Sequence, residues 1–253
     1  MRRLGEGSID MVVTSPPYDD ARVYKNETEW EKPFSWINTI KSLYRVMKPG
    51  GVVVWIVNDM TENGGETLTS FRQALHAQKV GFRQHDTMIW NKGSFAFPSN
   101  GRYHQTFEYM FIWSKGKPKT FNPLKDRKNK YLGVRGASGR SKDGTRNKGQ
   151  SSVRDEYGMR FNVWDCPVGG NHCSPDKEAY EHPAIFPESL VQDHILTWSN
   201  PGDTVYDPFM GSGTTAKMAM LNDRAWIGSE YSKEYCEIAV RRLKKYGQVE
   251  LAT

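Results

Sequence analysis

The run from Gly51 to Val57 is the sequence feature that most limits how this chain can fold. It reads Gly-Val-Val-Val-Trp-Ile-Val and contains no charged side chain. A continuous β-branched run of this kind is typical of a strand that is covered on both faces, as in a parallel sheet. The sequence therefore predicts a sheet with helices packed against both of its faces.

The apolar segments on either side of this run alternate between strand and helix patterns. Strands are predicted at 9–13, 85–90, 107–113, 204–207 and 224–230, and helices at 33–47, 66–78, 187–198, 214–222 and 232–246. Such alternation predicts an α/β fold with a parallel sheet and crossover helices. Residues 91–105 are expected to form a loop that faces the site. No run approaches the roughly 20 apolar residues that a membrane span needs.

The segment Ser15-Pro16-Pro17-Tyr18 follows the first predicted strand. Each proline fixes its own φ and keeps the residue before it extended, so the segment is expected to form a rigid loop. The loop presents a hydroxyl, a carbonyl and an aromatic ring at the carboxyl end of a strand, where open α/β sheets bind their ligands. Such groups can hold a flat ring that carries an amino group. A proline turn without a function fits these four residues equally well.

A second motif, running from Asp207 to Thr214, joins a predicted strand to a predicted helix and reads Asp-Pro-Phe-Met-Gly-Ser-Gly-Thr. Glycines let the backbone approach a ligand, and the start of a helix offers unpaired N–H groups. Glu230 follows the next strand, where nucleotide-binding βαβ units place a carboxylate on ribose hydroxyls. The motif has no Walker lysine and lacks the third glycine of a dinucleotide loop. It therefore favours a nucleoside ligand without a pyrophosphate.

Positive charge is concentrated in one segment of the chain. The net charge is +6, and residues 115–160 contain 14 Lys or Arg against four Asp or Glu. This segment is also rich in Gly, Ser and Asn, which is typical of a solvated insertion. Clustered cations also bind polyanions, because they release the counterions of nucleic acid. The two interpretations are compatible.

The three cysteines, Cys166, Cys173 and Cys236, form no CxxC pair, which favours a reduced, intracellular protein. Cys166, His172, Cys173 and His182 lie close together in the sequence, but their spacing matches no common zinc pattern. No metal site is predicted.

In the order of its motifs the chain resembles the S-adenosylmethionine-dependent DNA amino-methyltransferases, which modify N4 of cytosine or N6 of adenine. In the β arrangement of that family, a catalytic S/D/N-P-P-Y/F motif comes first, then the target-recognition region, then a cofactor motif F-x-G-x-G. Here the matching pieces are Ser15 to Tyr18, the basic segment, and Phe209 to Gly213. Residues 182–190 resemble the cofactor-pocket motif of the family.

The resemblance implies a Rossmann-like class I methyltransferase fold, with a mostly parallel seven-stranded sheet and helices on both faces. It divides the chain into a catalytic half (1–116), a basic target-recognition insertion (117–165) and a cofactor-binding half (166–253). Family members usually have a further strand and turn before the catalytic strand, whereas about eight residues precede Ile9 here. Another part of the chain is therefore expected to form that wall of the adenine pocket.

The resemblance also assigns roles to residues. The expected catalytic residues are Ser15, Pro16, Pro17 and Tyr18. Ser15 and Pro16 accept hydrogen bonds from the target amine, and Tyr18 stacks on the flipped base. The cofactor S-adenosylmethionine is expected to contact Asp207, Pro208, Phe209, Gly211, Ser212, Gly213, Thr214, Glu230 and Phe186. The candidates for DNA binding are Arg22, Tyr24, Lys125, Arg127, Lys128, Lys130, Arg135 and Arg140. Asn58 and Asp59 are weaker candidates for contacts with the base or the DNA backbone.

Serine at the first motif position is commoner among cytosine-N4 enzymes and aspartate among adenine-N6 enzymes, so Ser15 favours cytosine N4, with adenine N6 as the alternative. Methylation of carbon 5 is rejected, because the only Pro-Cys-like pair is the reversed Cys166-Pro167. A nucleic-acid-binding module without chemistry and an RNA substrate stay open. Double-stranded DNA is the expected partner. A homodimer and a companion restriction endonuclease are left open, and the expected location is the cytoplasm of a prokaryotic cell or phage-infected host.

Overall fold

A computed structural model of the chain describes residues 1, 3–17, 34–95, 101–135, 138–148, 152–169, 172–247 and 249. It divides into two compact units, one made of Met1–Asn122 with Asn162–Thr253, and the other of Pro123–Phe161. The second unit spans fewer residues than the insertion predicted at 117–165. Residues 117–122 and 162–165 belong to the large unit, where they adjoin the sheet and its helices.

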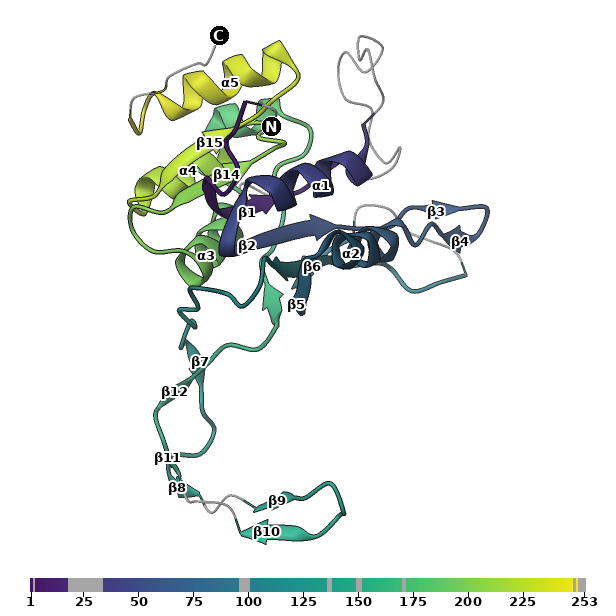
Figure 1. Cartoon of the computed structure of the whole chain (residues 1–253), viewed down its shortest axis with the longest axis vertical. Helices are drawn as coiled ribbons and strands as arrows, with labels where there is room; N and C mark the ends of the chain where they lie inside the picture. The colour runs from purple at the N-terminus through teal and green to yellow at the C-terminus, as the bar shows by residue number, and fades with distance from the viewer. Residues whose placement is uncertain are drawn as a thin grey trace. The chain divides into compact units, whose positions relative to one another are not determined.

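The large unit is built on a seven-stranded sheet with the order β13-β5-β6-β2-β1-β14-β15 (Figure 1). Strand β6 is antiparallel to both of its neighbours, and all other pairs are parallel. The mostly parallel α/β fold predicted from the sequence is therefore confirmed. The strands are β1 (Ile9–Thr14), β2 (Met47–Val57), β5 (Arg83–Asn91), β6 (Phe107–Ser114), β13 (Val163–Asp165), β14 (Thr204–Asp207) and β15 (Ala225–Gly228).

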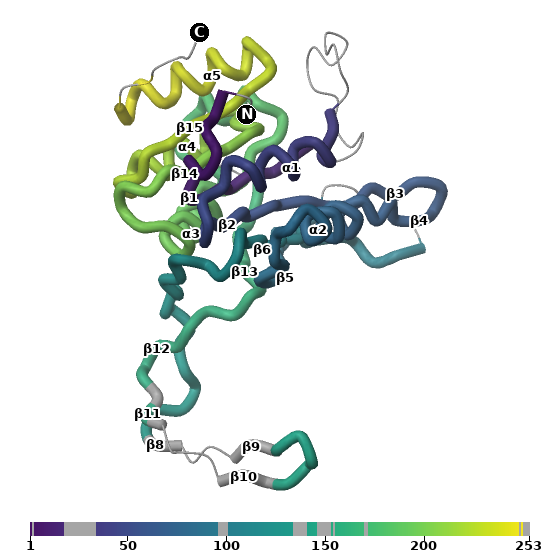
Figure 2. The backbone as a smooth tube through the Cα atoms, in the orientation of Figure 1, coloured from purple at the N-terminus to yellow at the C-terminus, as the bar shows by residue number. Residues whose placement is uncertain are grey.

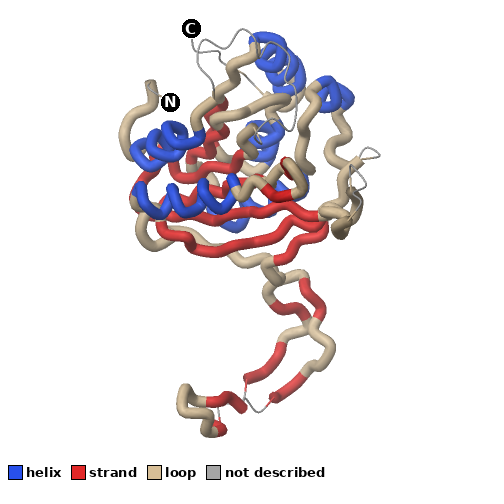
Figure 3. Tube along the Cα trace, turned by 90° about the vertical axis from the view of Figure 1, so that its right-hand side faces the viewer, coloured by secondary structure: helices blue, strands red, loops and turns tan. Residues whose placement is uncertain are grey.

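Helices cover both faces of this sheet, as the buried run in β2 requires (Figure 3). Successive side chains of a strand point to opposite faces. Val53, Trp55 and Val57 pack in one core with helices α1 and α2, whereas Met110, which lies beside Ile56, contacts helix α3 on the other face. The helices are α1 (Trp36–Val46), α2 (Thr69–Val80), α3 (Glu188–Trp198), α4 (Thr214–Leu221) and α5 (Lys233–Leu243), with a 3₁₀ helix, η2 (Lys177–Glu181). Of the helices in the described ranges, none is long and apolar enough to cross a bilayer.

Two features near the sheet differ from the sequence prediction. Strand β13 at the sheet edge lies within the range predicted for the basic insertion, because three residues in a polar stretch give no strand pattern. Its Trp164 pairs with Trp90 of β5. Helix α2 begins at Thr69 rather than near residue 66. A short hairpin of β3 (Thr61–Glu62) and β4 (Gly65–Glu66) precedes it. The Asp59 carboxylate accepts hydrogen bonds from the backbone N–H and the hydroxyl of Ser70 and so fixes the first turn.

The second unit, which we call the basic arm (Pro123–Phe161), is a series of antiparallel two-stranded ladders (Figure 2). At its turn, the Asp143 carboxylate accepts hydrogen bonds from the backbone N–H and hydroxyl of Thr145, and Gly144 has a positive φ. The paired strands are β7 (Arg127–Lys128) with β12 (Tyr157–Gly158), β8 (Gly133–Arg135) with β11 (Ser152–Arg154), and β9 (Ser138–Arg140) with β10 (Arg146–Lys148).

One buried polar contact between β2 and α2 yields a stability prediction. The Trp55 indole N–H donates to Gln73 Oε1 over 2.6 Å, and both side chains are buried. The substitution Gln73→Leu leaves that N–H without its acceptor, which costs about 1–3 kcal/mol. We expect urea unfolding to show this loss. Gln78→Leu, on the exposed surface of the same helix, is the control and should change the free energy of unfolding by less than about 0.5 kcal/mol. Equal effects would contradict the prediction.

Candidate active site

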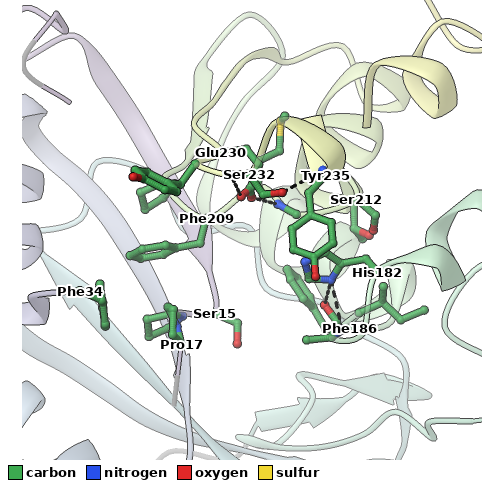
Figure 4. Close-up of a pocket in the computed structure, with 18 of the residues that line it drawn as sticks. Ser15, Pro17, Phe34, His182, Phe186, Phe209, Ser212, Glu230, Ser232 and Tyr235 are labelled. Atoms are coloured by element: carbon green, nitrogen blue, oxygen red, sulfur yellow. Dashed lines mark hydrogen bonds between the residues drawn. The ribbon is translucent and has the colours of Figure 1, made fainter. Parts of the chain in front are cut away.

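A cavity of about 280 Å³ lies at the edge of the sheet where β1, β14 and β15 end (Figure 4). Ser15 follows β1, Pro208 follows β14, and Glu230 lies just beyond β15. Both sequence motifs therefore open into one space. The predicted site residues that line it are Ser15, Pro16, Pro17, Phe186, Pro208, Phe209, Gly211, Ser212, Thr214 and Glu230.

Asp207, expected to contact the cofactor, instead lies behind the cavity wall and is buried. Its Oδ1 accepts hydrogen bonds from the Thr14 hydroxyl at 2.6 Å and from the Phe209 N–H at 3.0 Å. Its Oδ2 accepts a hydrogen bond from the Thr215 hydroxyl at 2.8 Å. Thr14 directly precedes Ser15, so one carboxylate joins strand β1, the glycine loop (residues 209–213) and helix α4. Burial raises the pKa of Asp207 to about 6, although these three donors act in the opposite direction.

The glycine loop is held by hydrogen bonds to the carboxylate of Glu230. Its Oε2 accepts a hydrogen bond from the Gly211 N–H at 2.8 Å, and its Oε1 accepts one from the Ser232 N–H at 2.9 Å. A carboxylate has about four acceptor positions, so lone pairs remain for ligand hydroxyls. Gly211 has a φ of +51°, and a β-carbon there would lie 3.0 Å from Nε2 of His182. Glycine is therefore required both by the backbone conformation and by the neighbouring ring.

Aromatic rings form two sides of the cavity (Figure 4). The rings of Phe209 and Phe34 meet edge to face with centroids 5.2 Å apart, and those of His182 and Tyr235 with centroids 4.3 Å apart. His182 is fixed by its Nδ1, which lies 2.8 Å from the Ala184 carbonyl oxygen. These surfaces suit a flat or positively charged ligand, because aromatic faces attract both.

The sequence did not identify several residues that line the cavity. The Trp90 side chain lines the cavity, and its indole N–H donates to the Cys166 carbonyl at 2.7 Å. Glu108 also lines the cavity and is paired with Lys92 at 3.1 Å. Because β6 runs antiparallel to β5, the first residues of β6 lie beside the carboxyl end of β5. If all strands were parallel, Glu108 would lie at the opposite ends of the strands. The register of that hairpin, which pairs Trp90 with Glu108, could have revealed both residues.

Not all of the remaining predicted residues are among those that the structure describes. Tyr18, Arg22 and Tyr24 are outside the described residues. Asn58 and Asp59, the weaker candidates, bond within the large unit, Asn58 to Gln105 and Asp59 to Ser70. Gly213 has a φ of +83° and faces Leu243 of α5 rather than the cavity.

The remaining DNA-binding candidates belong to the basic arm. Lys125, Lys128 and Lys130 are exposed. Arg127 is committed to the arm itself, because its Nε donates to the Met159 carbonyl and its guanidinium lies over the Phe161 ring. Arg135 and Arg140 lie in strands β8 and β9. Within the described parts of the chain, no three His, Cys, Asp or Glu side chains gather as metal ligands.

Comparison with known proteins agrees with this geometry. A family model described as a DNA methylase, for N6- and N4-methyltransferases, matches residues 9–241. The orphan methyltransferase M.BamHII of Bacillus amyloliquefaciens is 56% identical over 96% of this chain and 91% of its own length. The DNA adenine methyltransferase YhdJ of Escherichia coli is 29% identical over 100% of this chain and 83% of its own.

The solved structure of the PvuII DNA methyltransferase, which is described as cytosine-N4-specific, has the same fold. It matches with a TM-score of 0.69 and 21% identity over 95% of this chain and 81% of that one. The family match spans nearly the whole chain and includes both motifs that meet in the cavity. The chain therefore belongs to the S-adenosylmethionine-dependent DNA amino-methyltransferases.

Proposed function

We propose that this protein transfers a methyl group from S-adenosylmethionine to the exocyclic amine of a base flipped out of DNA, and that the base is cytosine, modified at N4. One observation carries the proposal: Ser15 and Pro16 share a single cavity with Phe209, Gly211 and Glu230. The methyl acceptor and the methyl donor can therefore meet without a change of fold. A module that only binds nucleic acid has no need of this shared space.

The cavity suits the cofactor chemically. Glu230 retains acceptor positions for ribose hydroxyls, and the rings of Phe209 and Tyr235 offer faces for an adenine or a sulfonium. When bound, S-adenosylmethionine supplies a methyl group already activated by its positively charged sulfur. The Thr14–Asp207 hydrogen bond supports this arrangement, because it fixes the end of β1 against the loop that contacts the donor.

The task of Ser15 and Pro16 is to prepare the amine. Its lone pair is delocalised into the ring, so it is a poor nucleophile. The Ser15 hydroxyl and Pro16 carbonyl accept hydrogen bonds from it and favour a tetrahedral nitrogen with an available lone pair. Held by Phe209, Gly211 and Glu230, the cofactor would supply its methyl group to this nitrogen, its sulfur would keep the electron pair of the broken carbon–sulfur bond, and the surplus proton of the nitrogen would pass to water. Positioning and electrostatics carry most of the rate. Tyr18 is proposed to stack on the flipped base.

The choice of base rests on Ser15. A neutral hydroxyl is the form that this family uses more often with cytosine. The adenine alternative is supported by the relative YhdJ, which is described as a DNA adenine methyltransferase. The two outcomes are separated by the product itself.

We further propose that the basic arm contacts the DNA backbone, through Lys125, Lys128 and Lys130 and through arginines of the same arm. Lys128 lies in the two-stranded ladder of β7 and β12, and Lys125 and Lys130 flank that strand. The major groove of DNA admits a two-stranded β-ribbon. Arg22 and Tyr24 are proposed contacts near the catalytic loop. We propose the cytoplasm of a prokaryotic cell as the location, because the relatives M.BamHII and YhdJ are bacterial proteins. The word orphan in the name of the relative M.BamHII favours action without a companion nuclease.

The first prediction concerns catalysis. Ser15→Ala should lower methyl transfer at least about a hundredfold, because it removes an acceptor from the amine, while S-adenosylmethionine binding by calorimetry stays within about threefold. Ser8→Ala, whose hydroxyl bonds only locally to the Gly5 carbonyl, is the matched control. Mass spectrometry of digested product DNA should find N4-methylcytosine. N6-methyladenine without it would overturn the cytosine assignment, and a wild-type protein that binds no S-adenosylmethionine would favour the inert module.

The second prediction concerns the arm. Replacing Lys125, Lys128 and Lys130 together by Gln should weaken DNA binding and reduce the slope of log affinity against log salt by about 0.9 per lost phosphate contact. Affinity for S-adenosylmethionine should not change. The matched control replaces three exposed lysines of the large unit, Lys41, Lys79 and Lys244, by Gln. An equal loss of DNA affinity in both triple variants would mean that the arm has no special role.

The third prediction concerns Asp207. Its folded-state pKa of about 6 lies above the value of about 3.9 for an unfolded chain. The folded state therefore binds the proton more tightly than the unfolded state. Protonation of Asp207 thus adds to the free energy of unfolding at low pH, and this stabilisation is lost as pH rises through 6. Between pH 7.5 and 4.5 the wild type should gain roughly 2 kcal/mol relative to Asp207→Asn. Denaturant unfolding at both pH values measures the difference. Parallel changes in the two proteins would contradict it.

A further inference from the structure

A buried ion cluster lies behind the glycine loop and takes no part in the reaction described above. It consists of Asp176, Glu188, Lys217 and Arg242. The four residues come from the segment before η2 and from helices α3, α4 and α5. Arg242 is completely buried and Lys217 is 2% exposed. Burying charged groups costs free energy, so the burial of these side chains needs a structural or functional explanation.

The charges of the cluster are satisfied internally. Arg242 donates from Nε to Asp176 at 2.8 Å and from Nη2 to Glu188 at 2.6 Å. Lys217 donates to the same two carboxylates at 2.9 and 2.8 Å, and Tyr246 donates to Asp176 at 2.6 Å. Burial alone would raise the pKa of Asp176, but the hydrogen bonds from Arg242, Tyr246 and Lys217 lower it to about 2. Two cations therefore balance two carboxylates.

The third nitrogen of Arg242 points away from the carboxylates and toward the loop. Its Nη1 donates to the Ser212 carbonyl at 2.9 Å and to the Thr214 hydroxyl at 3.1 Å, and it lies 3.4 Å from the Ser212 hydroxyl. Ser212 and Thr214 both line the cavity, whereas Arg242 does not. The guanidinium thus contacts the cavity wall from behind.

The shape of the guanidinium matters here as well as its charge. Lys217 pairs with both carboxylates from the α4 side, although its one charge balances only one of them. Only a planar group with several fixed donors can hold Asp176, Glu188 and the Ser212 carbonyl at once. Helix α5 also packs against the loop directly, because a β-carbon at Gly213 would lie 3.2 Å from Leu243. The last helix is therefore fitted to the loop by both packing and hydrogen bonds.

We propose that Arg242 is a positioning residue for the cofactor: it holds Ser212 and Thr214 in the conformation that binds S-adenosylmethionine, and so sets cofactor affinity without touching the ligand. This inference rests on the proposed function of the cavity. The conservative variant Arg242→Lys keeps the positive charge beside Asp176 and Glu188. Its single ammonium cannot reach those carboxylates and the loop together, so the Ser212 carbonyl and the Thr214 hydroxyl lose their donor.

The test is calorimetric titration of the full-length protein with S-adenosylmethionine, together with steady-state kinetics. We expect Arg242→Lys to raise Kd and KM for the cofactor about tenfold, while kcat at saturating cofactor stays within about threefold. Arg241→Lys is the matched control and should bind as the wild type. Arg241 is the neighbouring residue on α5, is exposed, and pairs with Glu181 at 2.6 Å.

Calorimetry separates positioning from a purely structural role. A structural defect reduces the fraction of competent protein, which lowers the binding stoichiometry and kcat but leaves Kd unchanged; that result would overturn the proposal. A double-mutant cycle with Thr214→Val adds a second readout, because losses through a shared contact are not additive. Additive losses would also overturn it. A wild-type protein that binds no S-adenosylmethionine would overturn the proposed function itself. Wild-type binding with an unaffected Arg242→Lys would reject only the present inference.

Discussion

The buried carboxylate of Asp207 joins the carboxyl ends of β1 and β14. Thr14 donates to it from the end of β1, and the Phe209 N–H donates to it from the glycine loop. These are adjacent parallel strands, so the hydrogen bonds set how far each strand extends toward the cavity. The relative position of Ser15 and the glycine loop follows from this contact. A buried polar group is costly unless all of its partners are present, so the arrangement leaves little freedom in either loop.

A second layer of buried polar contacts supports the first. Glu230 accepts the backbone N–H of Gly211 at the front of the loop, and Arg242 donates to the Ser212 carbonyl from behind. The backbone of the loop is therefore bonded on both sides, and its glycines remove the side chains that would obstruct His182 and Leu243. Hydrogen bonds to backbone atoms hold the cavity wall in place. Such bonds constrain the shape of the wall more than the amino-acid sequence of the loop.

Much of this could be predicted from local sequence. The continuous run 51–57 indicated a strand buried on both faces, and the two motifs indicated loops at strand ends; the α/β fold and the family are confirmed. The misses have physical causes. The edge strand β13 has three residues and carries no pattern of its own. Glu108 faces the cavity because one strand is reversed within the sheet, and direction is a property of pairing rather than of composition. Arg242 looks like a surface residue of a basic helix, and only tertiary contacts reveal its burial. Assignment of the site residues to their ligands stays a prediction.

The pairing of β1 with β14 has a consequence for how the protein is made. Thr14 and Asp207 are separated by 193 positions in the chain but share a hydrogen bond. During synthesis at the ribosome, β1 can pair early with β2, yet its other edge stays open until β14 has emerged. Contacts between residues so distant in sequence are slow to form and leave a strand edge exposed meanwhile. Ser15 is therefore synthesised well before the glycine loop that lines the same cavity, so the cavity can form only after β14 and that loop have left the ribosome.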